Sequence, residues 1–349
     1  MSKRTAVIIP LSLALGLAGL YLAVGEAVFR PETYRVQNPG VPVAVFIVIT
    51  FLAKWASPAV RIWLLCRAQK IPIPYRSALL VHLVAIFGAA LAPQNTGFGP
   101  ATVAALSRLG VPIGRGIGVA MQVVVLDLVF FAWTVPLSLT YLVYSDVIEL
   151  PSGITVVALT TACLGIVAAA VLSRRPRFVA YLIFVVARWR FMARFASRLR
   201  RIARDYYRSA RTFLKMPAPY WSALHLATAV GWFGGFALLW VLMRLYGVEV
   251  DLLATLAVLT GLTLVSNFVP TPGAAGFMEA AVGFSIGANS GGGAGAALLV
   301  WRLASFYAIF LLGPLAGWLL ILSRSVAATG GGRETRHRTD PRPGDHSLF

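Results

Sequence analysis

Charged residues are scarce in this chain. Asp, Glu, Lys and Arg make up 12% of its 349 residues, about half the fraction of roughly 25% that is usual in soluble domains. Hydrophobic residues make up 58%, and the mean hydropathy is +0.79. Apolar runs near the roughly 20-residue length that spans a bilayer recur along the sequence. The composition excludes a soluble globular protein and predicts an all-α, polytopic helical membrane protein.

Acidic residues are rarer still, with 12 Asp and Glu against 31 Lys and Arg and a net charge of +19. Such an excess is common in proteins that bind nucleic acid. Here, however, the basic residues lie in short loops beside apolar runs, which is the pattern of loops on the cytoplasmic side of a membrane. We therefore expect no nucleic-acid partner.

Cysteine is nearly absent, because Cys66 and Cys163 are the only two, and both lie in or beside apolar runs. They predict small core residues and neither a disulfide nor a metal pair. The sequence contains no nucleotide-binding G-x-x-x-x-G-K-[ST] motif, no His-rich cluster and no acid pair with a supporting base. We expect no metal, no cofactor and no enzymatic activity. His82 and His225 are predicted to be structural histidines with satisfied hydrogen bonds.

Apolar runs divide the chain into about eight segments. Two are short and lead into sequences rich in Pro and Gly, and six are long enough to span a membrane. The first of the six follows "MSKR" and has no A-x-A-like cleavage site after it, so it is expected to be a retained helix and not a signal peptide. The predicted spans are residues 6–24, 41–65, 117–143, 154–172, 221–245 and 297–322, and the short runs are 78–92 and 252–269.

Loop charges predict the topology. Basic loops follow the second and fourth spans, 41–65 and 154–172, so both chain ends are expected in the cytoplasm of a plasma-membrane protein. Residues 174–215 contain thirteen Arg or Lys and one acid, and they predict a cytoplasmic amphipathic helix that lies on anionic headgroups; a solvated basic loop is the alternative. This segment would join two halves, 41–172 and 220–323, of one membrane domain, residues 1–328. Residues 329–349 are polar and are expected to form a disordered cytoplasmic tail.

Each short run ends in a sequence that breaks helices. "APQNTGFGPATVAAL" (92–106) and "VPTPGAAGFMEAAVGF" (269–284) share an early proline, nearby glycines and an Ala-rich helix start. Proline and glycine disfavour a continuous helix, and unpaired backbone is not tolerated in lipid. The pair predicts two re-entrant hairpins of opposite orientation, as in transporters built from inverted repeats; two ordinary kinked helices are the alternative. The residues expected to shape the hairpins are Pro93, Gly97, Gly99, Pro270, Pro272, Gly273 and Gly276.

Charges inside apolar segments mark candidate site residues. Glu279 and Arg302 lie at similar distances from the turn near Ser290, so they are expected to pair at similar depth, either as a substrate site or as a structural lock. Asp127 is expected to pair with Lys54 or Arg61, or to relay protons. Two further candidates for lipid-headgroup contact are Arg108 and Asn95.

The second break carries a family resemblance. With "LLVWRLASFYAIFLLGPLAGWLL" after it, "VPTPGAAGFMEAAVGF" resembles the C-terminal signature of the lysylphosphatidylglycerol synthase transmembrane family, Pro-x-Pro-Gly-Gly-x-Gly-x-x-Glu-Ala and an Arg-containing last helix. Ala274 replaces a glycine of that signature, and Gly99-Pro100 stands where a Gly-Glu is common in the first half. The matching residues are Pro270, Pro272, Gly273, Gly276, Glu279, Ala280 and Arg302.

This resemblance covers about residues 41–322 and implies the flippase half of that family. The half that makes the lipid from aminoacyl-tRNA has no counterpart here, so synthase activity is not expected. We therefore expect translocation of a phospholipid, aminoacylated or not, or of a polyprenyl-phosphate lipid. The expected partners are membrane lipids with anionic headgroups, and a second copy of the chain or a separate lipid-modifying enzyme. The alternative function is a non-transporting accessory subunit for a lipid- or glycan-modifying enzyme.

Overall fold

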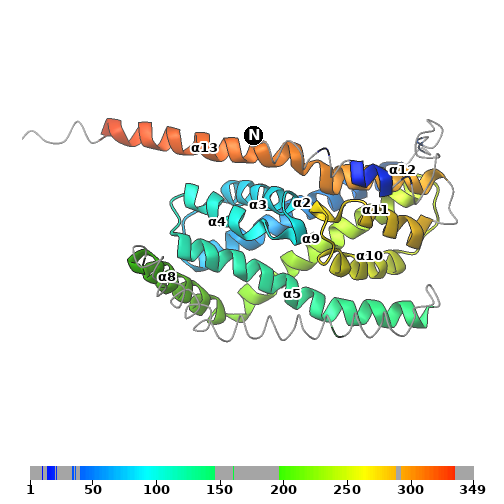
Figure 1. The fold of residues 1–349 in the computed structure, drawn as a ribbon, viewed down its shortest axis with the longest axis horizontal. Coiled ribbons are helices and arrows are strands. Elements are labelled where there is room, and N and C mark those ends of the chain that lie inside the picture. Colours follow the sequence, from blue (N-terminus) through cyan, green and yellow to red (C-terminus); the bar gives the residue numbers. More distant parts are fainter. Residues whose placement is uncertain are drawn as a thin grey trace, which may run out of the picture.

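Helices form all the regular structure in the part of the chain that the computed structural model describes. That part comprises residues 40–145, 196–287 and 292–334, with residues 10, 14–19, 21, 34, 36 and 160, and it contains no strand (Figure 1). The α-helices are α2 (Gly40–Ala68), α3 (Tyr75–Ala90), α4 (Phe98–Arg108), α5 (Ile113–Tyr144), α8 (Ala196–Leu214), α9 (Ala218–Leu245), α10 (Leu252–Ser266), α11 (Phe277–Val282), α12 (Gly292–Arg302) and α13 (Ile309–Glu334). Shorter turns are 3₁₀ in η3 (Pro93–Asn95) and η5 (Pro272–Ala274), and π-helical in η6 (Gly283–Gly287) and η7 (Leu303–Tyr307).

Four helices of the described part are long and apolar enough to cross a membrane: Gly40–Ala68, Ile113–Tyr144, Ala218–Leu245 and Gly293–Ser323. They coincide with four of the predicted spans, and many of their large apolar side chains are exposed, as lipid contact requires. The predicted span 6–24 is described only at residues 10, 14–19 and 21, and the predicted span 154–172 only at residue 160, so the number of spans is not tested. Helix α13 continues past residue 329, where the polar tail was expected to begin, and residues 335–349 are outside the described part.

Two short helix pairs occupy the places of the short apolar runs. In the first hairpin, α3 ends at Ala90, the chain turns through η3, and α4 packs beside α3. In the second hairpin, α10 ends at Ser266, and α11 packs beside it after η5. Proline cannot donate a helical hydrogen bond, and left-handed residues complete each break, with φ 53° at Gln94 and 60° at Gly273. Neither break is therefore a kink in a continuous helix.

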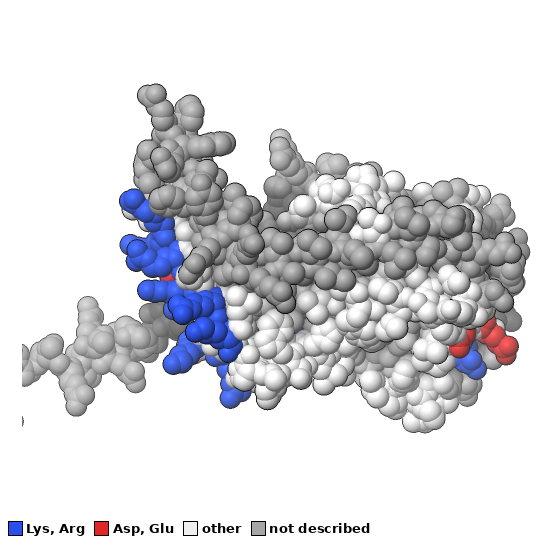
Figure 2. Space-filling view, turned by 90° about the horizontal axis from the view of Figure 1, so that it is seen from below, with Lys and Arg blue, Asp and Glu red and all other residues white. Residues whose placement is uncertain are grey.

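These hairpins open toward opposite ends of the molecule. Helices α4 and α8 lie at one end in Figure 1, whereas α10, α11 and α12 gather at the other. Figure 2 shows Lys and Arg side chains crowded at the first end, and acidic side chains at the second. Helix α3 has 16 residues against 32 in α5, so the tip of the first hairpin lies about halfway along the bundle. The second tip contacts the first, because η3 and η5 pack together.

Helix α8 docks on the protein through its apolar face. Ala203, Tyr206, Ala210 and Phe213 recur at helical spacing, are buried, and face the interface with α5. Gln122 of α5 supports the contact, because its side-chain nitrogen donates to the backbone oxygen and to the hydroxyl of Ser209, each at 3.1 Å. The sequence predicted that this apolar face lies on the membrane, but α5 covers it instead. The arginines of α8 are exposed on its outer side, and residues 174–195 lie outside the described part.

Candidate functional site

Glu279 and Arg302 form a buried ion pair, as the sequence predicted. The Nε–H of Arg302 donates to Oε1 of Glu279 at 2.7 Å, and the two residues are 5% and 2% exposed. The break at η5 starts α11 just before Glu279, while α12 ends at Arg302. A carboxylate buried in an apolar bundle requires such a partner, because an unpaired charge there is very costly.

Two further donors complete the shell of Glu279. The backbone N–H of Gly276 donates to Oε2, and the hydroxyl of Tyr307 donates to Oε1, both at 2.9 Å. The π-helical turn η7 is held by a hydrogen bond from the N–H of Ala308 to the carbonyl of Leu303, five residues earlier. This wider turn brings residues five apart onto the same side of the helix, so Arg302 and Tyr307 reach the same oxygen. Sequence reasoning missed Tyr307, and the only signal was a hydroxyl in an otherwise apolar helix.

The guanidinium of Arg302 is only partly satisfied. Its central carbon lies 4.4 Å from the centre of the Phe306 ring, within range of a cation–π interaction. Its Nη2 atom is buried without a hydrogen-bond partner. A small cavity of about 70 Å³ lies beside the ion pair and is lined by Gly16, Leu17, Glu279, Leu299, Arg302, Leu303 and Tyr307. The cavity has room for more than one water, since about 10–15 Å³ suffices for one.

An N-terminal helical segment, residues 14–19, forms one wall of this cavity through Gly16 and Leu17. A Cβ atom added to Gly16 would lie 1.6 Å from the Tyr307 hydroxyl, and one added to Gly19 would lie 2.2 Å from the carbonyl oxygen of Gly276. Only glycine permits an approach this close. Sequence reasoning treated this run as a span alone, although it is rich in small residues, which let membrane helices approach closely.

Side-chain amides join the two hairpin tips. The Nδ2 of Asn95 donates to Oδ1 of Asn267 at 3.2 Å, and both residues are exposed. Gln94 and Thr96 beside them are also exposed. The structure therefore places a patch of uncharged polar groups halfway along an apolar bundle. Asn95 was a predicted site residue, whereas Asn267 was missed.

The hairpin glycines do not all have the same role. Gly273 and Gly276 have φ of 60° and 86°, in the left-handed region that favours glycine, and a Cβ on Gly273 would lie 2.0 Å from the Phe306 ring. A Cβ on Gly97 would lie 1.9 Å from the carbonyl oxygen of Gly88, so Gly97 lets the first break approach α3. Gly99 has no neighbour within 4 Å of an added Cβ, and nothing in the structure requires glycine there. Pro93, Pro270 and Pro272 lie in or beside η3 and η5.

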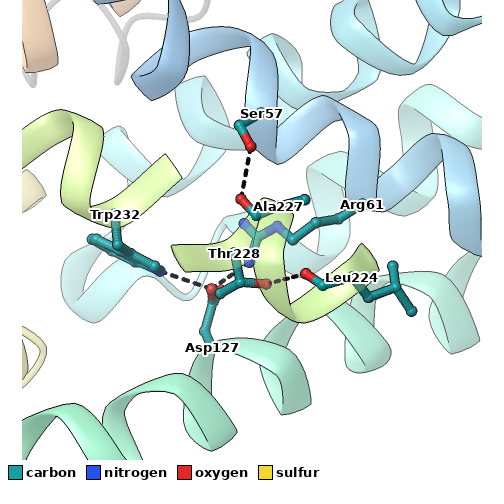
Figure 3. A network of polar contacts seen from close by, with 7 residues as sticks. All are labelled: Ser57, Arg61, Asp127, Leu224, Ala227, Thr228 and Trp232. Carbon is teal, nitrogen blue, oxygen red and sulfur yellow. Dashed lines mark hydrogen bonds and ion pairs between the residues drawn. The ribbon is translucent and has the colours of Figure 1, made fainter. Parts of the chain in front are cut away.

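Asp127 belongs to a separate polar network between α2, α5 and α9 (Figure 3). Its Oδ1 accepts hydrogen bonds from Arg61 and, at 2.9 Å, from Nε1 of Trp232. Of the two predicted partners, the structure selects Arg61. The ammonium of Lys54 instead lies 5.3 Å from the centre of the Trp232 ring. No hydrogen bond or ion pair within the described part joins this network to Glu279.

Arg108 lies apart from both networks. It is exposed in the last turn of α4, at the basic end of the molecule (Figures 1 and 2), whereas Glu279 follows η5, which meets η3 about halfway along the bundle. Across the described residues, no group of three His, Cys, Asp or Glu side chains is placed to hold a metal ion.

The comparisons with known proteins agree with this architecture. The family model described as "Lysylphosphatidylglycerol synthase TM region" matches residues 8–313, which include both hairpins, Glu279 and Arg302. No curated protein matches the chain.

Proposed function

The chain belongs to the lysylphosphatidylglycerol synthase TM-region family, and on that premise we propose that it is a flippase-like protein that moves a lipid headgroup across the bilayer. The lipid is a phospholipid, aminoacylated or not, or a polyprenyl-phosphate lipid. The two hairpins are re-entrant halves of an inverted repeat. The headgroup passes their tips while the acyl or prenyl tails stay in the hydrocarbon.

One observation carries this proposal: the tips of two oppositely opening hairpins meet at Asn95 and Asn267. Exposed carboxamides and left-handed backbone at mid-depth are unfavourable against lipid. They are favourable if this patch faces water or a passing polar headgroup. The buried pair of Glu279 and Arg302 then holds the second hairpin in shape beside the path.

Charge at the two ends supports an orientation. The basic end, with α8 and Arg108, is the cytoplasmic one if the protein follows the positive-inside pattern. We also propose that both termini lie in the cytoplasm of a cell-membrane protein, because the sequence is basic at its start and in its tail. Exposed arginines at that end also favour anionic headgroups.

Reconstitution into liposomes tests the proposal. Fluorescent phospholipids are incorporated in both leaflets, and a membrane-impermeant quencher reports how fast the inner-leaflet pool becomes accessible. Proteoliposomes are expected to expose that pool faster than protein-free liposomes for at least one headgroup. Equal rates for phosphatidylglycerol, its lysyl ester, phosphatidylethanolamine and a polyprenyl phosphate would overturn the proposal.

A second candidate function is an accessory subunit that transports nothing and supports a separate lipid- or glycan-modifying enzyme. The observation in its favour is the size of the cavity beside Arg302, about 70 Å³, which is too small to hold a whole lipid headgroup. In that case the flipping rates stay at background, and the chain co-purifies with an enzyme from its native membrane at a fixed stoichiometry.

A further inference from the structure

The charges in the middle of the membrane bundle do not balance. Within the described residues, the middles of the apolar helices carry three cationic side chains, Lys54, Arg61 and Arg302, but two carboxylates, Asp127 and Glu279. The apolar runs 6–24 and 154–172, of which the structure describes only a part, contain no Asp or Glu. Among the described residues and these two runs, the interior is therefore short of one negative charge.

Lys54 is the cation left over. Arg61 pairs with Asp127, and Arg302 pairs with Glu279. Within the described part, the ammonium of Lys54 makes no ion pair and has the Trp232 ring as its contact. Its stem lies against Gly235, where an added Cβ would approach the Lys54 Cδ to 2.9 Å, so neighbouring backbone restrains the side chain. A lone ammonium in a low-dielectric interior is unfavourable unless it loses its proton or gains an anion.

Nearby donors also lack acceptors. Nε of Arg61 and Nη2 of Arg302 make no hydrogen bond with any described residue, and only 5% of the surface of each of the two residues is exposed. Two sets of contacts bring the arginines near Lys54. Lys54 and Asp127, the partner of Arg61, both contact Trp232. Gly235, which lies beside the Lys54 stem, accepts a hydrogen bond from Trp301, the neighbour of Arg302 in the chain. Nε2 of His82, on the facing helix α3, is a donor or an acceptor according to the tautomer. It is buried and makes no hydrogen bond within the described part, so the expectation of a fully satisfied histidine is wrong. Buried donors without acceptors are rare in proteins and point to an absent ligand or water.

We propose that Lys54, with Arg61 and Arg302 beside it, binds the phosphodiester of a net-anionic lipid headgroup. A phosphodiester carries one negative charge, which is the charge that the interior lacks, and its oxygens are the acceptors that the two arginines lack. A phosphate monoester carries a charge of about −1.5 to −2 at pH 7, which is more negative charge than the single ammonium of Lys54 balances. A headgroup that also carries an ammonium group has no net negative charge and would leave the positive charge of Lys54 unbalanced. The assignment to a lipid rests on the proposed function, and the anion site itself does not.

Binding to the full chain in detergent tests this inference without requiring transport. Thermal unfolding is followed while short-chain phosphatidylglycerol, short-chain phosphatidylcholine or inorganic phosphate is added. Phosphatidylglycerol is expected to bind about tenfold more tightly than either of the others. Equal affinities for the two lipids would overturn the proposal, and tighter binding of inorganic phosphate would overturn the assignment to a lipid.

Variants at position 54 locate the site. Lys54→Met is expected to weaken phosphatidylglycerol binding about tenfold, whereas Lys54→Arg keeps it because the charge is kept. Lys70→Met, a matched change at the exposed basic end, is expected to leave the affinity unchanged. Unchanged binding in Lys54→Met would refute the site. If Lys54→Met fails to fold, the preference of the native chain for phosphatidylglycerol over phosphatidylcholine still tests the anion site. A native chain that flips lipids but shows no such preference would refute the anion site and leave the proposed function standing.

Discussion

Asn95 and Asn267 lie 172 positions apart in the chain, yet their side-chain amides meet across 3.2 Å. Each sits where a helix has been broken, so the contact joins the tips of the two hairpins. A single hydrogen bond between exposed amides adds little stability. Its importance is positional, because it places both breaks at one point in the bundle.

Cysteines at these two positions test the contact. We expect Asn95→Cys combined with Asn267→Cys to form a disulfide under mild oxidation, which intact-mass measurement detects, and to slow lipid flipping if the tips must separate. Reduction restores the rate. The pair Asn95→Cys with Tyr144→Cys is the control, because Tyr144 lies at the far end of α5. Equal cross-linking in the two pairs would show that the tips are not neighbours.

Removing one member of the buried ion pair leaves the other charged side chain buried without a partner. Arg302→Met leaves the Glu279 carboxylate without its guanidinium, so we expect a loss of about 3–5 kcal/mol in the free energy of unfolding. The double variant with Glu279→Gln is expected to lose less than the sum of the two single variants, since no charge remains buried. Thermal or denaturant unfolding in detergent measures both. Arg108→Met, at an exposed site, is the control and is expected to leave the free energy of unfolding almost unchanged. If the losses of the two single variants simply add in the double variant, Glu279 and Arg302 do not interact directly.

Two glycine substitutions with opposite expected results test the N-terminal packing. Gly16→Val puts side-chain atoms where the Tyr307 hydroxyl lies, so we expect a loss of about 1–3 kcal/mol from overpacking. Gly99→Ala meets no atom within 4 Å and is expected to change stability by no more than about 0.5 kcal/mol. Both are read from unfolding midpoints. An unchanged midpoint in Gly16→Val would mean that residues 14–19 do not cover the site in the membrane.

Asp251 makes stability depend on pH at the end of the molecule opposite α8. It caps α10, and the N–H of Ala254, at 2.7 Å, together with the Tyr141 hydroxyl, holds the pKa of this carboxyl below its usual range. Because the pKa of Asp251 is lower in the folded chain than in the unfolded chain, where it is about 3.9, its ionised form stabilises the fold. That stabilisation is fully present at a pH above the unfolded-state pKa and is lost as the pH falls through the folded-state pKa. Asp251→Asn keeps a capping oxygen but cannot ionise. Between pH 7 and 3 its unfolding midpoint should therefore fall less than that of the native chain, and identical pH profiles would contradict the assignment.

Local chemistry in the sequence determined the helical elements. Apolar runs of sufficient length predicted four spans that the structure contains, because a bilayer-length helix needs little beyond hydrophobicity. Pro93 and Pro270 predicted the breaks, since proline acts on its own turn of helix. The pairing of Glu279 with Arg302 followed from their equal distance to one turn and from the cost of a lone buried charge.

Tertiary structure decided the contacts between segments far apart in the chain. Asp127 had two candidate partners on the same helix, and the packing of α2 against α9 gave it Arg61 and Trp232. Tyr307 reaches Glu279 only because η7 is wound as a π-helix. The apolar face of α8 suits a membrane surface as well as a protein surface, and only the position of α5 settled which one covers it. Hydrophobicity and helix breaking depend on neighbours in the sequence, whereas the choice among equivalent partners depends on which surfaces come to lie together in space.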